Sequence, residues 1–118
     1  MTAQSTVLKY EAIKSLNTAT LAGAYLPIGA PTTHEVTIAE ILNDSTVGVF
    51  ISTDGGTDMD FVRANTDRQY AAGTNRGAAS PSLSFPRGTQ FYAKAAAGVG
   101  FVHIAILYGD LSAQTAPL

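Results

Sequence analysis

The segment from Asn43 to Val62, NDSTVGVFISTDGGTDMDFV, constrains the fold of this chain more than any other segment does. Its VGVFIS run alternates between two faces with a period of two, which is typical of a β-strand, and its MDF run resumes the alternation. The intervening DGGT supplies glycines, which tolerate the positive φ angles of tight hairpin turns. The segment therefore predicts a β-hairpin within a small β-sandwich.

Further short strands are predicted on both sides of this hairpin. Glu35–Asn43 is one of them, with a short helix as the alternative for its TIAEIL part; Ile41 is out of step with the other apolar residues, which indicates a face change or a bulge. Asn43–Ser45 is expected to form a turn, because Asn, Asp and Ser side chains bond to nearby backbone groups. The other predicted strands are Lys9–Ser15, Thr18–Leu26, a short strand around Arg68–Ala72, Leu83–Phe85, Thr89–Lys94 and Val99–Tyr108.

Together these segments predict one all-β domain. The chain has 118 residues, enough to bury a single core, and its strands recur about every ten residues with turn residues between them. We expect a single-domain antiparallel β-sandwich or jelly roll of about eight short strands. The domain begins with a polar N-terminal segment and ends with a C-terminal tail at residues 110–118.

The composition argues against several classes of function and favours a partly covered surface. Charged residues make up 14% of the chain and hydrophobic residues 46%, which is little charge for a free-standing soluble domain. Neighbouring subunits that cover part of the surface would explain this, although a quiet alanine-rich domain has the same composition. The net charge of −2 argues against a general nucleic-acid binder, and no run approaches the ~20 apolar residues of a membrane span. The chain has no cysteine, which fits folding in a reducing cytoplasm.

The arginines are the best candidates for contacts with a partner. All of them fall between Arg63 and Arg87, a window whose net charge is +3, while the rest of the chain carries −5. A planar guanidinium pairs with carboxylates better than an ammonium group does, so this window suits an acidic patch on a partner. Solvated loop charges are the alternative, and Tyr70 alone gives too little aromatic surface for nucleic-acid binding. The predicted partner-binding residues are Arg63, Arg68, Tyr70, Arg76 and Arg87.

The segment Val99–Tyr108, VGFVHIAILY, is apolar on both faces. A strand of this kind is central in its sheet and covered on both sides. One cover is the core, and we expect the other to be a crossing segment of this chain or a neighbouring subunit. His103 shares a face with Phe101 and Ala105, which indicates a sheet edge or a subunit contact.

The hairpin turn carries Asp54, Asp58 and Asp60, which form a weak candidate for a metal site. Carboxylates at alternate positions can gather around Ca²⁺, which takes six to eight oxygen ligands. The turn lacks a distal bidentate glutamate, and Asp58 and Asp60 flank Met59 on the expected solvent face of a strand. Solvated turn residues are therefore the favoured interpretation, and no metal or other cofactor is predicted.

The sequence contains no arrangement that indicates catalysis. Its hydroxyl groups do not lie in a GxSxG elbow, and its glycine-containing stretches match neither the dinucleotide fingerprint nor the phosphate-binding loop. His34 and His103 lie far apart in the sequence, and without cysteine a structural zinc site has too few soft ligands. We therefore predict a protein that is not an enzyme and has no small-molecule substrate.

Three stretches of the chain share a recognisable pattern: KSLNTATLAGAYLPI, then EVTIAEILNDSTVGVFISTDGGTDMDFV, then RGTQFYAKAAAGVGFVHIAILYG. The pattern resembles that of a family of small virion proteins of tailed bacteriophages, and it covers roughly residues 13–109. The chain departs from it at Arg63-Ala64-Asn65, where the family has a Pro-Ala-Gly turn. The matching residues are Asn43, Ser45, Ser52, Asp54, Gly55, Thr57, Asp58, Phe61, Gly88, Thr89, Tyr92, Lys94 and Gly98.

The resemblance implies a structural component of a virion, made in the cytoplasm of the bacterial host. The first interpretation is a capsid decoration (cement) protein, a homo-oligomer that binds the major capsid protein through its arginine window and its two tails. A head–tail connector, neck or tail component is the alternative. A second alternative is a carbohydrate-binding jelly-roll module of a fibre or spike, which would bind through exposed aromatic side chains. The candidates for that role are Tyr10, Tyr25, Tyr70 and Tyr92.

Overall fold

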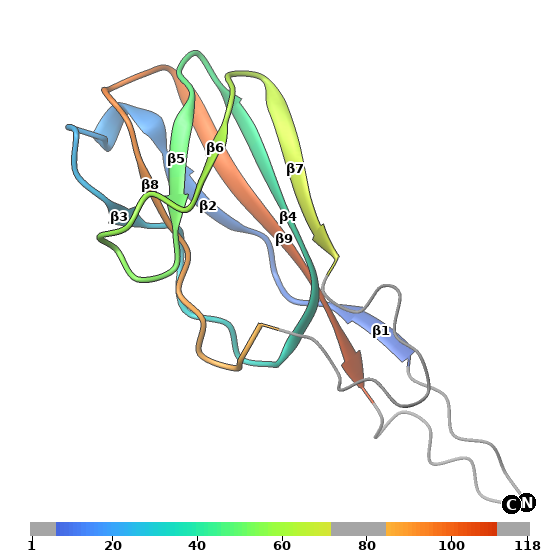
Figure 1. Ribbon diagram of the computed structural model, residues 1–118. Coiled ribbons are helices and arrows are strands. Elements are labelled where there is room, and N and C mark those ends of the chain that lie inside the picture. Colours follow the sequence, from blue (N-terminus) through green and yellow to red (C-terminus); the bar gives the residue numbers. More distant parts are fainter. Residues whose placement is uncertain (1–6, 72–84, 111–118) are drawn as a thin grey trace, which may run out of the picture.

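The computed structural model describes residues 7–71 and 85–110, which form a sandwich of two antiparallel β-sheets (Figure 1). Among these residues there is no α-helix, and one 3-10 turn lies between strands. The predicted all-β sandwich is therefore confirmed. The elements are β1 (Val7–Tyr10), β2 (Lys14–Asn17), η1 (Thr18–Thr20), β3 (Leu26–Pro27), β4 (Val36–Ser45), β5 (Val49–Ser52), β6 (Asp60–Val62), β7 (Thr66–Ala71), β8 (Tyr92–Lys94) and β9 (Gly100–Asp110).

The larger sheet, which we call sheet A, has the order β1–β9–β4–β7, and β2 also pairs with β9. Its two long central strands pair from Val36 opposite Tyr108 to Ser45 opposite Gly100. The register shifts between Val36 and Ile38, which confirms the bulge expected in this strand. β9 is thus a central strand, as its apolar pattern predicts.

The N-terminal edge of sheet A is broken into two short strands. β1 pairs with the end of β9 and β2 with its start, so the prediction of one continuous strand at Lys9–Ser15 is wrong in its middle. The cause is Glu11, whose carboxylate accepts hydrogen bonds from the backbone N–H groups of Thr33 and His34, at 3.1 and 3.0 Å. Lys14 Nζ lies 3.6 Å from the other carboxylate oxygen. Burial acts to raise the pKa of Glu11, but the hydrogen bonds from His34 and Thr33, together with Lys14, lower it on balance.

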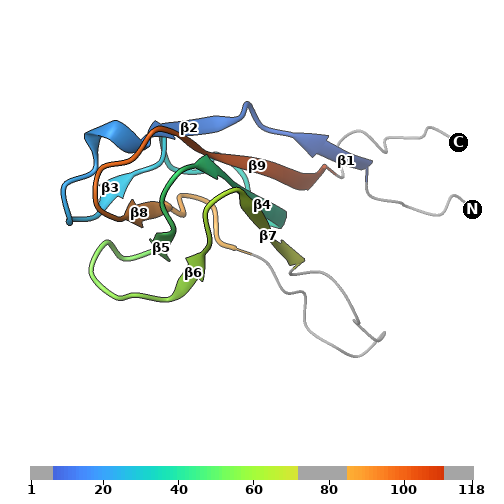
Figure 2. The same ribbon diagram turned by 90° about the horizontal axis from the view of Figure 1, so that it is seen from above.

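The smaller sheet, sheet B, has the order β3–β8–β5–β6 and forms the second layer of the sandwich (Figure 2). β5 and β6 are the hairpin that the opening segment predicts, with Val49 opposite Val62 and Phe50 opposite Phe61. In the turn between them Gly55 has a φ of 77°, a left-handed conformation that glycine adopts without strain. The turn chemistry of the sequence therefore predicts this pairing correctly.

The core lies between the two sheets and is formed by alternate residues of their strands. Val102, Ile104 and Ile106 of β9 are 0% exposed, and they pack across the sandwich against sheet B. The other buried apolar side chains are Leu21, Ile28, Val36, Ala39, Ile41, Val49, Ile51, Val62, Phe91 and Ala93. Because β9 alternates, its remaining apolar residues project from the opposite face of sheet A.

The strand predicted at Thr18–Leu26 is wrong, because Thr18–Thr20 form η1 and only the last residue of that range enters β3. The Asn17 side chain caps η1 and accepts a hydrogen bond from the N–H of Ala19 at 2.9 Å. The buried Thr18 hydroxyl donates to the carbonyl oxygen of Gly100 at 3.1 Å. Local side-chain bonds of Asn and Thr thus outweigh the β-propensity of the threonines.

The turn predicted at Asn43–Ser45 is also wrong, because β4 continues to Ser45. The side chains of Asn43 and Ser45 are buried, and Ser45 Oγ donates to Asn43 Oδ1 at 2.6 Å. The Asn43 amide nitrogen donates to three carbonyl oxygens, those of Val47, Val62 and Arg63, at 2.8, 3.0 and 3.1 Å. The polar residues that indicate a turn in the sequence instead tie the end of β4 in sheet A to the end of β6 in sheet B.

The least regular part of the sequence is described only at its two ends. β7 confirms the short strand expected around Arg68–Ala72, with bounds one or two residues earlier. Most of the loop predicted at Ala64–Ser82, and the first two residues of the strand predicted at Leu83–Phe85, lie outside the described residues. Phe85 itself forms an isolated bridge with Val36.

Candidate functional site

The hairpin turn is organised by the Asp54 side chain. Its carboxylate accepts hydrogen bonds at 2.8 Å from the N–H groups of Gly56 and Thr57 and from the hydroxyls of Ser52 and Thr57. The N–H groups of Thr57 and Gly56 are the main reason why the pKa of Asp54 lies well below its usual range. Asp54 therefore builds the loop, and both of its oxygens already accept hydrogen bonds within it.

Asp58 belongs to a second cluster, on the outer face of sheet B. Lys94 Nζ lies 2.8 Å from its carboxylate, and the Tyr25 hydroxyl donates to the same oxygen. The ammonium group also lies 5.0 Å from the ring centroid of Tyr25 and 5.2 Å from that of Phe50. Burial and Asp58 raise the pKa of Tyr25 to about 12. On this face the single lysine is thus matched by one carboxylate and two aromatic rings.

Asp60 points between the sheets, so the expectation that it faces solvent is wrong. It lies opposite Ile51 in the β5–β6 ladder, and Ile51 is a core residue, so the two side chains share the inner face. The Tyr70 hydroxyl donates to Asp60, and Arg68 Nη1 lies 3.5 Å from it. Burial acts to raise the pKa of Asp60, but the hydrogen bond from Tyr70 outweighs it and the pKa falls. Phe61 is exposed instead.

The three carboxylates of the turn therefore have three separate sets of partners. Within residues 7–71 and 85–110, no group of three or more His, Cys, Asp or Glu side chains is placed to hold a metal ion. Beside Asp60 an open cleft of about 240 Å³ lies between the sheets, and Tyr70, Met59 and Phe85 line it with core residues. Its polar pair is internally satisfied, because Tyr70 and Asp60 bond to each other.

The predicted arginine surface is not one patch in the described part of the chain. The backbone carbonyl of Arg63 bonds to Asn43 near the end of β4, whereas Arg87 lies in the turn after Phe85, which bridges the start of β4. Seven residues of β-strand separate these two places, a span of roughly 23 Å. Arg68 is bound to Asp60 and to the carbonyl oxygen of Phe61, at 3.3 Å. Arg76 lies outside the described residues.

The residues that carry the bacteriophage resemblance serve the scaffold in this structure. Asn43 and Ser45 join the sheets, Ser52 and Asp54 build the turn, and Lys94 pairs with Asp58. In the turn that follows β6, Asn65 has a φ of 56°. Asparagine is among the few residues other than glycine that enter this left-handed region readily.

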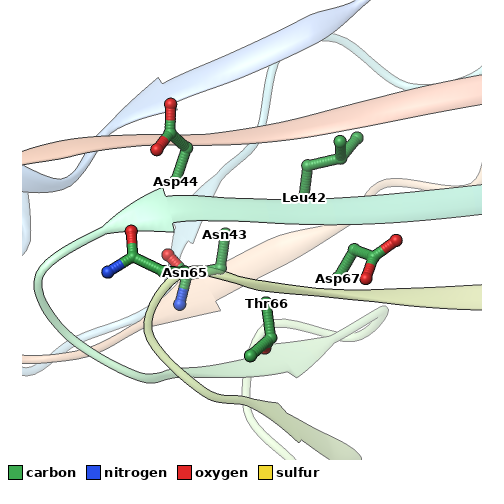
Figure 3. A pocket seen from close by; sticks show the side chains of 6 residues that line it. All are labelled: Leu42, Asn43, Asp44, Asn65, Thr66 and Asp67. Atoms are coloured by element: carbon green, nitrogen blue, oxygen red, sulfur yellow. The ribbon is translucent and has the colours of Figure 1, made fainter.

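A shallow pocket of about 250 Å³ marks the end of the β4–β7 pair (Figure 3). Leu42 and Asp44 project to one side of β4 and Asn43 to the other (Figure 3). Asn43 is the buried cross-sheet link, whereas Asp44 is exposed. Three of the residues that line the pocket, Leu42, Asp44 and Asp67, also belong to a larger surface that extends beyond it.

That surface is the outer face of sheet A, the side opposite the core. The registers of the five strands place on it the β9 residues that alternate with the core residues, and their neighbours on β1, β4 and β7. Phe101 is 44% exposed and Tyr10 72%, and none of the described segments lies over this face (Figure 2). Its apolar side chains are Tyr10, Ile38, Leu42, Phe101, Ala105 and Leu107. The described residues therefore cover only the core-facing side of β9 and leave its other apolar side exposed.

The charged groups of this outer face are all acidic in the described strands: Glu40 and Asp44 on β4, and Asp67 on β7. Hydrogen bonding to the neighbouring Asp67, with burial and the charge of Asp67, raises the pKa of Glu40. His103 stacks on Phe101 with ring centroids 5.8 Å apart, and its Nδ1 lies 2.7 Å from Ser15 Oγ. The face therefore combines apolar surface with carboxylates and has no lysine or arginine among its described residues.

The sequence indicates only half of this surface. The two-sided pattern of Val99–Tyr108 predicts a second apolar face that needs a cover, and His103 lies on the face of Phe101, as expected. Glu40, Leu42 and Asp67 are missed, because the out-of-step Ile41 indicates a face change or a bulge and not a second apolar face, and because only strand pairing brings Asp67 beside β4. The pattern that identifies the outer face of β9 also applies to β4, because β4 carries apolar residues on both of its faces.

No family model, no curated protein and no solved structure matches the chain. No helix in the described residues is long and apolar enough to cross a membrane.

Proposed function

We propose that the chain is a non-enzymatic structural protein of a bacteriophage virion, a capsid decoration protein that binds and stabilises the shell of major capsid protein. The observation that carries the proposal is the outer face of sheet A, where apolar side chains of two central strands have no cover in the described chain. Exposed apolar patches of this kind mark interaction sites. The resemblance of the hairpin and of β8 to virion proteins supplies the class of assembly.

The size of this face fits a contact that is repeated many times. Four strand positions at ~4.8 Å spacing and about eight residues at ~3.4 Å give a flat area on the order of 500 Å². A standard stable interface buries about 800 Å² on each partner, so one such contact is weak alone. Symmetric repetition over a shell adds many weak contacts, and the resulting avidity exceeds that of each one. The protein thereby reinforces the shell without any chemical step.

The direct test is a phage particle from which this protein has been deleted. We expect the particle to assemble and to lose resistance to heat and to osmotic shock, and we expect intact particles to contain hundreds of copies of the protein. Quantitative mass spectrometry of purified particles gives the copy number. Deleted particles with unchanged heat and osmotic resistance would contradict the proposal.

The copy number also separates the proposal from the connector, neck or tail alternative. Components at those positions follow the symmetry of a ring and occur in about six or twelve copies. The carbohydrate-binding alternative is less well supported, because its four tyrosines do not share a face. Tyr10 is on sheet A, Tyr70 lies between the sheets, and the ring of Tyr25 is covered by Lys94. A glycan array with no bound sugar would remove that alternative.

A further inference from the structure

We propose that the outer face of sheet A docks on a protein surface in which arginine or lysine side chains border an apolar patch, and that this surface belongs to a different protein, not to a second copy of the chain. The inference deepens the proposed function, because it names the chemistry of the partner surface. The predicted chemistry of the partner surface does not depend on where in a particle the partner lies.

The first argument is the placement of the acids within the apolar surface. Across the sheet, Glu40 lies between Gln69 of β7 and Ala105 of β9, and Leu42 lies between Asp67 and His103. The carboxylates are therefore interleaved with the apolar residues and are not confined to a solvated edge. A partner that covers Leu42 and Ala105 must also cover Glu40, and a covered carboxylate needs a positive partner to offset its lost hydration.

The second argument excludes a face-to-face dimer. In such a dimer the outer face of sheet A would meet itself, so both copies would contribute Glu40, Asp44 and Asp67, and neither would contribute a lysine or arginine from the described part of this face. Like charges brought together in an interface disfavour it strongly.

The third argument concerns the other surfaces of the same chain. A head-to-tail contact would need a cluster of basic side chains, but three of the described cations are paired within the chain: Lys14 with Glu11, Arg68 with Asp60 and Lys94 with Asp58. Lys9 also has an interaction partner, and Arg63 and Arg87 lie near opposite ends of β4. The described part of the chain therefore shows no basic patch that matches this acidic face, which favours a different protein as the source of the basic groups.

The Glu40–Asp67 pair gives the contact a recognisable signature. In the free protein the β4–β7 register places the two carboxyl groups near each other on the outer face, and hydrogen bonding to Asp67, with burial and the charge of Asp67, raises the pKa of Glu40. A guanidinium or ammonium group of the partner would bond to both carboxylates, and its positive charge would favour the ionised form of Glu40. The titratable groups that face the pair are His103 of β9 and Asp44 of β4, together with the two acids themselves. Binding is therefore expected to tighten as the pH rises through the raised pKa of Glu40.

The test uses a synthetic peptide of alternating arginine and leucine as the probe, with a glutamate–leucine peptide of equal length as its counterpart. Binding to the full chain is followed by NMR amide shifts. The test variant is Glu40→Gln with Asp67→Asn, and the matched control is Ala22→Lys with Ala96→Lys, two exposed loop positions. Each double substitution raises the formal net charge by two, so a general electrostatic effect acts equally on both.

We expect the arginine peptide to shift amides of Leu42, Phe101 and Ala105, and the glutamate peptide to leave them unchanged. The test variant should bind the arginine peptide about five- to ten-fold more weakly, and the control variant less than two-fold more weakly. Equal loss in both variants, or shifts confined to Phe50 and Phe61 on sheet B, would overturn the inference.

A second arm adds the same two variants to phage particles that lack the protein. Uptake of the control variant but not of the test variant supports both proposals. Uptake of both variants in equal amounts overturns the inference and leaves the proposed function standing. If neither the wild type nor any variant is taken up, while the peptide result holds, the proposed function fails and the inference about this face stands.

Discussion

The two outer faces of the sandwich both expose aromatic side chains but differ in how their charges are paired. On sheet B, Lys94 lies against Asp58 and over two aromatic rings, so the charge of that face is balanced within the chain. On sheet A, Glu40 and Asp67 have only each other, and no described lysine or arginine lies beside them. A face that pairs its own charges is complete without a partner, whereas a face with unpaired carboxylates among apolar residues is suited to one. The difference separates a structural surface from an interaction surface.

The largest expected effect is on stability, and it comes from removing the side chain that links the two sheets. Asn43→Ala removes one amide that serves three carbonyl oxygens at the ends of both sheets. We expect the free energy of unfolding to fall by about 3 kcal/mol, because buried polar groups lose their partners. Urea denaturation measures the change. Gln69→Ala, on exposed β7, serves as the control and should change stability by less than about 0.5 kcal/mol.

The second prediction compares one phenylalanine from each face. Phe101 on sheet A and Phe61 on sheet B are 44% and 40% exposed, so their alanine variants remove similar apolar surface. Phe101→Ala should weaken uptake by particles that lack the protein at least about ten-fold, because aromatic side chains buried in an interface contribute strongly to binding. Phe61→Ala should leave uptake unchanged. Equal losses for the two variants would show that both faces bind.

The third prediction tests whether sheet B is internally complete. Lys94→Met keeps the length of the side chain but removes the cation from Asp58, Tyr25 and Phe50. We expect a loss of about 1 kcal/mol in the free energy of unfolding, with no change in particle uptake. Thermal and urea unfolding measure the first quantity, and a sedimentation assay with particles measures the second. A Lys94→Met variant that folds normally but is not taken up would move the binding surface to sheet B.

The smallest effect concerns pH and has opposite signs on the two faces. The pKa of Glu40 is raised in the folded protein, so this group favours folding below its usual pKa and opposes folding once the pH rises through the raised value. Glu40→Gln should therefore stabilise the protein by about 0.5 kcal/mol at pH 7, and the gain should vanish by about pH 4. The pKa of Asp58 is lowered, mainly by Lys94, so Asp58→Asn should destabilise at pH 7 and become neutral in acid. Unfolding curves across this pH range check both signs.

The sequence predicts the fold well where a local pattern determines it. The DGGT turn between two alternating runs predicts the β5–β6 pair, and the two-sided pattern of Val99–Tyr108 predicts the central strand. It fails where a polar side chain bonds to a distant part of the chain. Asn43 looks like a turn residue in the sequence, but its carbonyl partners at Val62 and Arg63 come from the other sheet.

The candidate site is harder to predict than the fold. Arg63, Arg68 and Arg87 are close in the sequence, and strand pairing carries them to different places. Glu40 and Asp67 are far apart in the sequence, and the β4–β7 register makes them neighbours. A charge pattern along the chain therefore has little bearing on a surface that five strands assemble from three distant segments.

The broken edge of sheet A has a further consequence for association between copies of the chain. An unbroken edge strand offers a row of free backbone groups on which another copy can add a strand, and repeated addition leads to fibres. Here the carboxylate of Glu11 bends the edge between β1 and β2 and bonds to the segment at Thr33 and His34. A second chain cannot align along both short strands at once. The same residue that interrupts the strand thus removes a continuous edge on which another copy could add a strand.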